Sequence, residues 1–220
     1  GVQTCALPIL LADFFPATKP IVKGTIGDIL VNRHNFRRES FAKSLKDAAS
    51  AIFGWDRALL EGDTDVSRLF REQKDEYWSV ALNRDITPRL VLQLLGTEAG
   101  RQIFGKDLWV SSVERRIQQQ PHDNYVITDA RFENEIQKIR DMGGVIIRVV
   151  RGEKPEFEDT ATNNPSQMPI LYPHIHASEY EWMRCKFDIE YFNGGTLFQL
   201  AEDIENLLDS INSLQCCSSF

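Results

Sequence analysis

The chain has 220 residues, of which 42% are hydrophobic, and its formal net charge is −7. One sizeable core with a small inserted subdomain fits this length, and the acidic balance argues against a general nucleic-acid binder, which needs a basic face to displace counterions. No apolar run reaches the roughly 18 residues that span a bilayer, so we expect no membrane segment. The four cysteines are scattered without CxxC spacing, which favours a reducing, cytosolic setting.

The first residues differ in character from the rest. The segment 1–9, GVQTCALPI, resembles the translation of a sequencing adapter. We therefore expect residues 1–22 to be foreign at least in part, and we assign residues 23–214 to a single domain. Residues 9–15 can form a strand whatever their origin, and residues 25–32 suit a helix that follows a loop.

The next predicted elements are mostly helical, because apolar residues recur at helical spacing. They are a short strand within 34–41, a helix over 42–53 with Leu45, Ala49, Ile52 and Phe53 on its inner side and Gly54 at its end, a turn over 61–66, a polar helix over 67–81, a helix from Thr87-Pro88 through Phe104, and a helix from Asp107 to about Gln119.

The stretch 125–152, YVITDARFENEIQKIRDMGGVIIRVVRG, predicts a β-α-β unit. A short apolar run, an amphipathic segment that ends at a glycine pair, and a β-branched run follow one another. Parallel strands joined by a helix indicate an α/β sheet, in which ligands bind beyond the carboxyl ends of the strands. Asp129, Arg131 and Arg151 fall there, so we expect the chemistry at these residues. A simple ion pair between Asp129 and Arg131 is the alternative.

The segment Lys23-Gly24-Thr25 lies between the first apolar run and a helix. A lysine followed by a hydroxyl residue at a helix start is typical of a phosphate loop, in which backbone N–H groups meet phosphates and the hydroxyl reaches Mg²⁺. An ordinary helix cap explains these three residues equally well.

The preceding loop departs from the GxxxxGK[ST] pattern. Ala17 and Val22 stand where the pattern has glycines, and Pro20 removes one backbone N–H. A β-branched residue forced into a left-handed conformation costs on the order of 1–2 kcal/mol. We therefore expect the grip on phosphate to be impaired.

In the segment 87–98, TPRLVLQLLGTE, four residues share one predicted helix face: Arg89, Gln93, Gly96 and Thr97. A polar stripe that contains a glycine can lie against a flat ligand, whereas a solvated helix face is the simpler reading. Gly96 favours the binding role, because glycine within a helix costs about 1 kcal/mol. Trp109, at the next helix start, is more typical of a core residue.

The remaining segments are predicted as follows. Residues 153–173 are acidic and poor in apolar side chains, which indicates a lid or long loop. A strand over 188–192 and a closing helix over 196–214 complete the domain. Arg148, inside a strand, is expected to be a structural charge, and His174 and His176 are expected to serve in loops or caps rather than to bind a metal.

Several ordered motifs together resemble the phage-type deoxynucleoside monophosphate kinases, a family of the P-loop nucleotide kinase superfamily. They are KGT (23–25), SFAKSLKDA (40–48), FGW (53–55), LEG (60–62), TPRLVLQLLGTE (87–98), DLWV (107–110), VITDARFENE (126–135), RVVRG (148–152), HASE (176–179) and NGGT (193–196).

The resemblance implies an α/β, three-layer P-loop NTPase-like fold, with a five-stranded parallel sheet flanked by helices, a helical monophosphate-binding part at about 55–120 and a lid at about 152–175. It implies transfer of a phosphoryl group from ATP to a deoxynucleoside 5′-monophosphate, with Mg²⁺. The implied ATP-binding residues are Lys23, Gly24, Thr25, Asn193 and Gly195, with Thr25 also near the metal. The implied substrate-binding residues are Lys46, Arg89, Gln93, Gly96, Thr97, Trp109, Asp129, Arg131 and Glu135. Lys23, Arg131 and Arg151 are the implied catalytic residues.

Two other classes of protein stay open. A nucleotide-binding protein without catalysis is favoured if the loop before Lys23 is genuine, and an interaction protein is favoured if the site residues scatter in space. A homodimer is compatible with the sequence, which determines neither the oligomeric state nor the base that is accepted. If the protein is phage-encoded, we expect it in the cytoplasm of the host.

Overall fold

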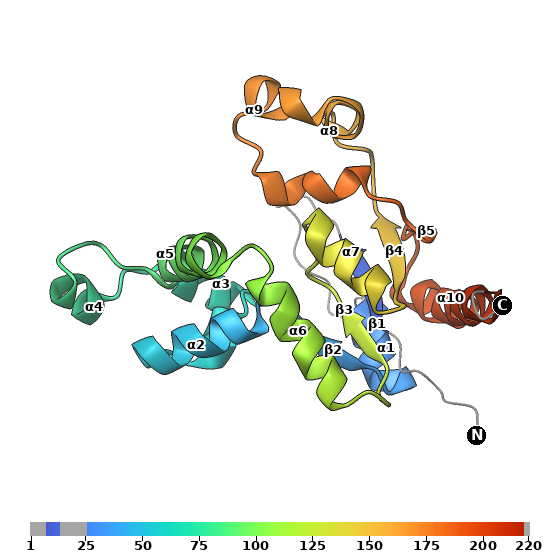
Figure 1. The fold of residues 1–220 in the computed structure, drawn as a ribbon, viewed down its shortest axis with the longest axis horizontal. Helices are drawn as coiled ribbons and strands as arrows, with labels where there is room; N and C mark the ends of the chain where they lie inside the picture. Colours follow the sequence, from blue (N-terminus) through green and yellow to red (C-terminus); the bar gives the residue numbers. More distant parts are fainter. Residues whose placement is uncertain (1–7, 14–25, 218–220) are drawn as a thin grey trace. The chain divides into compact units, whose positions relative to one another are not determined.

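The computed structural model describes residues 8–13 and 26–217, and the remaining residues, 1–7, 14–25 and 218–220, lie outside the described part. The chain divides into two compact units. Unit 1 consists of residues 1–40 and 117–220, and unit 2 consists of residues 41–116. All strands belong to unit 1, whereas the described elements of unit 2 are helical (Figure 1).

The sheet of unit 1 is parallel and has the strand order β2-β3-β1-β4-β5. Its strands are β1 (Pro8–Asp13), β2 (Arg37–Glu39), β3 (Tyr125–Ile127), β4 (Val145–Val150) and β5 (Ile189–Phe192). The central strand is β1, in which Leu10 is opposite Ile127 of β3 and Ile146 of β4. The predicted α/β class with parallel strands is therefore confirmed. The predicted β-α-β unit is present, but β1 lies between its two strands.

Helices cover both faces of this sheet. The helices of unit 1 are α1 (Ile26–His34), α7 (Glu133–Asp141), α8 (Glu158–Asn163), α9 (Met168–Leu171) and α10 (Leu197–Cys217), with short 3₁₀ turns η3 (Pro165–Gln167), η4 (Ala177–Glu179) and η5 (Glu181–Arg184). The buried residues of α1 and α10 form one core cluster with alternate residues of β4, Val145, Ile147 and Val149. Ile146 alternates to the opposite face, where α7, which contacts β1 and β4, packs its buried Ile136 and Ile139.

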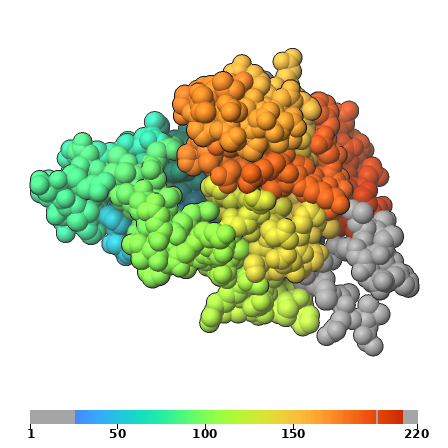
Figure 2. Space-filling view, turned by 45° about the horizontal axis from the view of Figure 1, so that its top comes forward, coloured from blue at the N-terminus to red at the C-terminus, as the bar shows by residue number. Residues whose placement is uncertain are grey.

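The segment 153–173 differs from the predicted loop, because it contains α8, η3 and α9. Phe157, Ala161 and Met168 are buried. The first two stand four residues apart and share one face of a helix, a signal too short to outweigh the acidic and asparagine-rich composition around it. The segment lies at the surface of unit 1 (Figure 2, light orange). Whether it moves as a lid stays a prediction.

Unit 2 is built around an aromatic and aliphatic core. Its elements are α2 (Lys43–Phe53), η1 (Arg57–Leu60), α3 (Asp65–Glu72), α4 (Glu76–Ala81), α5 (Pro88–Gln93), the π-helix η2 (Leu94–Phe104) and most of α6 (Leu108–Gln119). The buried core includes Ala49, Trp55 and Leu60. Phe53 stacks on Trp55 with ring centroids 4.6 Å apart. Gly54 ends α2 in the left-handed region at φ 72°, as its sequence position predicts.

Two predictions for α2 to α4 of unit 2 are wrong. Ile52 was expected to face inward, but it is 56% exposed. The polar helix predicted over 67–81 is two helices, α3 and α4. Asp75 separates them, because its carboxylate caps α4 by accepting the Trp78 backbone N–H at 3.0 Å and also accepts the Trp55 indole N–H at 2.7 Å. Within the described residues, no helix is both long and apolar enough to cross a membrane.

Asp75 should make the stability of the protein sensitive to acid. The hydrogen bonds from the Trp78 backbone and the Trp55 indole lower the pKa of Asp75 below its ordinary value. A carboxylate whose pKa is lowered by folding stabilises the protein above its unfolded-state pKa, and this contribution is lost as the pH falls through the folded-state pKa. We expect Asp75→Ala to reduce the free energy of unfolding at neutral pH by about 1–2 kcal/mol and to flatten its decline in acid. Urea unfolding over a pH series measures both effects.

The matched control for this prediction is Asp85→Ala. Asp85 is exposed and pairs with Lys74 at 2.7 Å. Because an exposed ion pair contributes little, this variant should change the free energy of unfolding by less than about 0.5 kcal/mol. Equal losses in the two variants would show that Asp75 has no special role as a cap.

Candidate active site

The carboxyl ends of the five parallel strands meet at one edge of the sheet, because parallel strands all point the same way. Three of the predicted site residues follow directly from these ends. Asp129 comes two residues after β3, Arg151 follows β4, and Asn193 follows β5. The chain beyond β1 contains Lys23, Gly24 and Thr25, which lie outside the described residues. The predicted phosphate loop therefore stays a prediction.

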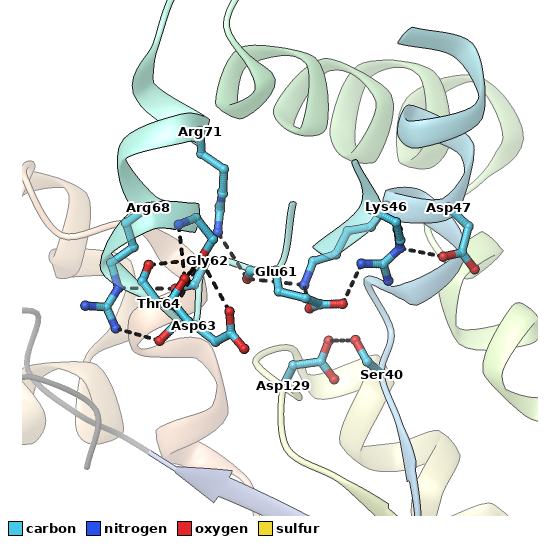
Figure 3. A network of polar contacts seen from close by, with 12 residues as sticks. Ser40, Lys46, Asp47, Glu61, Gly62, Asp63, Thr64, Arg68, Arg71 and Asp129 are labelled. Atoms are coloured by element: carbon cyan, nitrogen blue, oxygen red, sulfur yellow. Dashed lines mark hydrogen bonds and ion pairs between the residues drawn. The ribbon is translucent and has the colours of Figure 1, made fainter. Parts of the chain in front are cut away.

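Asp129 is held by a residue that the sequence interpretation missed. The Ser40 hydroxyl, directly after β2, donates a hydrogen bond of 2.6 Å to the Asp129 carboxylate (Figure 3). The two residues are 89 positions apart in the sequence, but β2 and β3 are neighbouring strands. Ser40 opens the SFAKSLKDA motif, and its place at the end of a strand was the signal that could have indicated its role.

The Glu135 side chain accepts hydrogen bonds from the backbone at the start of α7. Its side chain is 3% exposed and accepts backbone N–H groups from Arg131 at 2.8 Å and from Phe132 at 3.2 Å. These contacts satisfy amide groups at the start of α7, which otherwise have no partner within the helix. Glu135 therefore fixes the backbone of the Asp129–Phe132 turn. A direct contact of Glu135 with a substrate stays a prediction.

Two of the predicted site residues that follow β3 and β4, Arg131 and Arg151, are cations. Both side chains are exposed. Arg131 has no ion-pair partner in the part of the chain that the structure describes, and the Asp129 carboxylate is engaged by Ser40. The exposed guanidinium of Arg131 can form bidentate contacts with a phosphate.

The NGGT turn joins β5 to α10. The Asn193 backbone N–H donates to the Val150 carbonyl at 2.8 Å, which extends the sheet by one bond. Thr196 and Gln199 cap α10 reciprocally, since the Gln199 side-chain carbonyl accepts from the Thr196 N–H and the Thr196 hydroxyl accepts from the Gln199 N–H. A Cβ on Gly195 would stand 2.7 Å from Gln199 Oε1. Gly195 therefore permits the cap, which explains one glycine of the motif without a ligand.

In unit 2, Lys46 belongs to a network of charges that is centred on Glu61 (Figure 3). Its side chain is 15% exposed, and its ammonium group lies 2.5 Å from the Glu61 carboxylate. Arg57 pairs with the same carboxylate and, at 2.6 Å, with Asp47. Burial alone would raise the pKa of Glu61, but the hydrogen bonds and charges of Lys46 and Arg57 outweigh burial and lower it. The predicted phosphate ligand Lys46 therefore already has an anionic partner.

The LEG turn supports this network. Gly62 has φ 77°, and a Cβ at this position would stand 2.0 Å from Arg71 Nη1. The Glu61 carbonyl accepts a hydrogen bond from Arg71 at 3.4 Å. Gly62 thus lets an arginine of α3 approach the turn that carries Glu61.

The polar stripe of the 87–98 segment is not the regular one that was predicted. Residues 88–93 form an α-helix, but residues 94–104 form a π-helix, in which each turn contains an additional residue. The α-helical spacing that linked Arg89 and Gln93 to Gly96 and Thr97 therefore breaks after Gln93. Arg89, Gln93 and Thr97 are exposed, and Arg89 pairs with Glu72. π-Helical segments are frequent at functional sites.

Trp109 stabilises the π-helix. Its indole N–H donates to the Gly96 carbonyl at 2.9 Å, and its ring lies where a Cβ on Gly100 would be, at 2.6 Å. Trp109 is half-buried, which is consistent with the predicted core role. On Gly96, a Cβ would meet the Leu45 side chain at 3.1 Å. Close packing against α2 thus provides one reason for the glycine, beside the predicted flat ligand.

Glu98 is a second residue that the sequence interpretation missed. Its Oε2 atom is buried and has no hydrogen-bond partner among the described residues. A buried carboxylate oxygen without a donor costs free energy unless a ligand or water supplies one. Its position directly after Gly96 and Thr97, in the same motif, was the available signal.

The predicted site residues thus fall into two groups. Asp129, Arg131, Glu135, Arg151, Asn193 and Gly195 belong to unit 1, and Lys46, Arg89, Gln93, Gly96, Thr97 and Trp109 belong to unit 2. The prediction that Lys23, Arg89, Asp129 and Arg131 line one cleft stays a prediction. Of the two histidines, His176 acts as a cap, since its Nδ1 accepts the Ser178 N–H. In the described residues, no group of three or more His, Cys, Asp or Glu side chains is arranged for a metal ion.

Comparisons with known proteins agree with the motifs. The family model of deoxynucleotide monophosphate kinases matches residues 56–164. The deoxynucleoside-5′-monophosphate kinase of Escherichia phage T5 is 40% identical over 92 residues, which cover 40% of this chain and 37% of the phage protein. A protein of Acanthamoeba polyphaga mimivirus named "Putative deoxynucleotide monophosphate kinase" is 25% identical over 207 residues, which cover 87% of this chain and 93% of that protein. The family match includes Arg89 through Arg151 but excludes Lys23, Lys46 and the NGGT turn.

Two glycines of the π-helix should respond differently to an added methyl group. We expect Gly100→Ala to destabilise the protein by about 1–3 kcal/mol, because the Cβ would overlap the Trp109 ring and the Leu95 carbonyl, 2.8 Å away. Gly96→Ala should be tolerated, since the flexible end of Leu45 can move and alanine favours helix formation by about 1 kcal/mol. Thermal unfolding of both variants makes the comparison. A larger loss for Gly96→Ala would contradict this account of the packing.

Proposed function

We propose that this chain, whose resemblance to phage-type deoxynucleoside monophosphate kinases is confirmed by the comparisons, transfers a phosphoryl group from ATP to a deoxynucleoside 5′-monophosphate. The observation that carries the proposal is the family match over residues 56–164, which contains nine of the residues assigned to the site from sequence. We propose that the chain has a three-layer P-loop NTPase-like fold. We also propose that it acts in the cytoplasm of the host cell.

Unit 2 is assigned to the monophosphate. Lys46 and Arg89 are the cations for its phosphate, and both are paired with carboxylates in the structure, Lys46 with Glu61 and Arg89 with Glu72. Binding of the phosphate would exchange one anionic partner for another. Before the substrate binds, the carboxylate partners already hold both cationic side chains in an extended conformation. This reduces the entropy that the side chains lose on binding.

The strand edge of unit 1 is assigned to the transferred phosphoryl group. Arg131 and Arg151 would neutralise its charge, and Asp129 is oriented by its hydrogen bond from Ser40. Little covalent work is required in phosphoryl transfer, since the rate depends on positioning and on stabilising charge. The Glu135 contacts to the Arg131 and Phe132 backbone hold this turn in place.

A magnesium ion fits the oxygen donors of this edge. The Asp129 carboxylate and the Ser40 hydroxyl are hard oxygen ligands, and Thr25 is the hydroxyl assigned from the sequence. Mg²⁺ is usually held by one or two carboxylates together with substrate phosphates. When bound, the ion would supply positive charge that offsets the charge of the phosphates.

A second candidate function is nucleotide binding without catalysis. It is favoured by Ala17, Pro20 and Val22, which depart from the phosphate-loop pattern directly before Lys23. These residues lie outside the described part of the chain, and the argument rests on the sequence alone. Each departure removes either backbone freedom or an N–H donor from the cradle of the phosphates.

Arg89→Ala should raise the KM for the deoxynucleoside monophosphate by about tenfold or more, because a charge-assisted contact contributes roughly 1.5–3 kcal/mol. Glu72→Gln is the matched variant, since it releases Arg89 from its ion pair without removing the guanidinium. It should leave KM unchanged or lower it. Steady-state assays with a panel of deoxynucleoside monophosphates, ATP and Mg²⁺ measure both constants. An unchanged KM in Arg89→Ala for every accepted substrate would remove Arg89 from the site.

Restoring the phosphate loop should increase activity. A variant that combines Ala17→Gly, Val22→Gly and Pro20→Ser regains two flexible positions and one N–H donor. We expect it to bind ATP more tightly than the unaltered chain and to phosphorylate at least one deoxynucleoside monophosphate faster. A folded variant that binds ATP but phosphorylates none of them would exclude the kinase and favour the non-catalytic binder.

A further inference from the structure

Two cations of unit 2 hold one carboxylate between them. Lys46 of α2 lies 2.5 Å from Glu61 Oε2, and Arg57 of η1 lies 2.5 Å from Glu61 Oε1. The Glu61 carboxylate therefore offers one oxygen to each cation, as a small bound anion would. Lys46 is among the residues assigned to the substrate phosphate, whereas Arg57 and Glu61 have no assigned part in binding.

Of these three side chains, that of Glu61 is the most exposed. It is 42% exposed, compared with 29% for Arg57 and 15% for Lys46. Because the carboxylate borders solvent, an anion can approach it from water and replace it without entering the packed interior. Ion pairs that are open to solvent contribute little free energy, so the carboxylate can be displaced at low cost.

Arg57 is held from a second side. Its Nε–H donates to Asp47 of α2 at 2.6 Å, whereas its Nη1 donates to Glu61. If Glu61 moves away, the Asp47 contact still fixes the guanidinium, and the Nη1 group is left for another acceptor. An arginine that is oriented before binding loses less conformational entropy when it binds an anion.

The backbone of Glu61 is held independently of its side chain. Its carbonyl oxygen accepts from Arg71 of α3 at 3.4 Å and from the Lys46 ammonium at 3.5 Å, and Gly62 follows with φ 77°. Displacement of the carboxylate therefore leaves these contacts of the turn in place. Glu61 is thus a tethered carboxylate, an anion that is attached beside two cations and can leave them without unfolding its turn.

We propose that Lys46 and Arg57 together bind the phosphate of the deoxynucleoside monophosphate, and that Glu61 is a tethered competitor which this phosphate displaces. The phosphate carries about −1.5 to −2 charges at neutral pH, compared with a single negative charge on the carboxylate, and its terminal oxygens can accept from both cations. The inference deepens the proposed function and rests on it, because it takes a monophosphate as the substrate.

Competition by Glu61 makes the site selective among anions. A group on a short tether competes at an effective concentration in the millimolar range. Anions that bind through charge alone, such as inorganic phosphate and small carboxylates, are therefore excluded at lower concentrations. A deoxynucleoside monophosphate gains further contacts through its sugar and base, which a free anion lacks, and so displaces Glu61.

Calorimetric titration without ATP tests the role of Arg57. The full chain is titrated with the 5′-monophosphates of deoxyadenosine, deoxyguanosine, deoxycytidine and thymidine. Arg57→Ala should weaken the binding of each monophosphate that the unaltered chain binds by roughly tenfold or more, because a charge-assisted contact is lost. Arg57→Lys keeps the charge and should recover part of this affinity. Lys74→Ala removes an exposed cation of unit 2 that pairs with Asp85 and should leave the affinity unchanged.

Glu61→Gln tests the competition. It removes the charge but keeps the shape of the side chain, so it should tighten the binding of the monophosphate and of inorganic phosphate several-fold. The corresponding nucleoside, which has no phosphate, should bind equally to Glu61→Gln, Arg57→Ala and the unaltered chain. A merely structural role of these residues would instead lower the affinity for the nucleoside as well.

A second measurement uses the unaltered protein. Addition of the monophosphate should shift the carboxylate carbon resonance of Glu61, which Glu61→Gln identifies, and addition of the nucleoside should not. An unmoved resonance, an unchanged affinity in Arg57→Ala, or unchanged or weaker monophosphate binding in Glu61→Gln would overturn the inference. A chain that binds a monophosphate through Arg57 but transfers no phosphoryl group would overturn only the kinase, and a chain that binds none of the four would overturn both.

Discussion

The parallel pairing of β1 with β3 on one side and β4 on the other is the constraint on which the rest of unit 1 depends. It gives β1, β3 and β4 the same direction, and the parallel pairing of β2 with β3 and of β5 with β4 continues it, so that the carboxyl ends meet at one edge. Asp129 and Arg151 come from segments far apart in the sequence and are brought to that edge by this pairing, and the pairing of β5 with β4 adds Asn193. The sheet also separates two apolar layers, one with α1 and α10 and one with α7. A change of register in β1 would therefore affect the core and the site together.

Several charged residues in both units form ion pairs with nearby residues. Lys46 and Arg57 share Glu61 in unit 2, and Arg148 is paired with Glu158 in unit 1. Burying a charged group costs desolvation free energy. The attraction within an ion pair offsets this cost only when the geometry of the pair is good and its remaining polar atoms form hydrogen bonds. The Lys46 network is more exposed, so its partners can be exchanged at low cost. The Arg148–Glu158 pair is enclosed, so Glu158 Oε2, which has no hydrogen-bond partner among the described residues, costs more free energy there than an exposed atom would.

The sequence predicted most elements but not their arrangement. Regular periodicity identified α2, α7 and β4, and Gly54 marked the end of α2, because each signal is local. The insertion of β1 between β3 and β4 depends on pairing between distant residues and leaves no local pattern. The π-helix was not predicted, because a turn with an additional residue has no distinct amino-acid composition. As a result, Arg89 and Gly96 do not have the α-helical spacing that was predicted for them. Ser40 and Glu61 were missed because their partners stand in other elements.

Unit 1 is formed by two segments that are separated in the sequence by unit 2, and this affects the order in which the units can fold during synthesis. A ribosome releases β1 and α1 first, but the neighbours of β1 begin only at Tyr125, after the whole of unit 2. At translation rates of roughly 5–20 residues per second, an interval on the order of 10 s separates these events. During this time a central strand has neither partner, while unit 2, a continuous segment, can already be compact. Chaperone capture of nascent chains should therefore be concentrated in this interval.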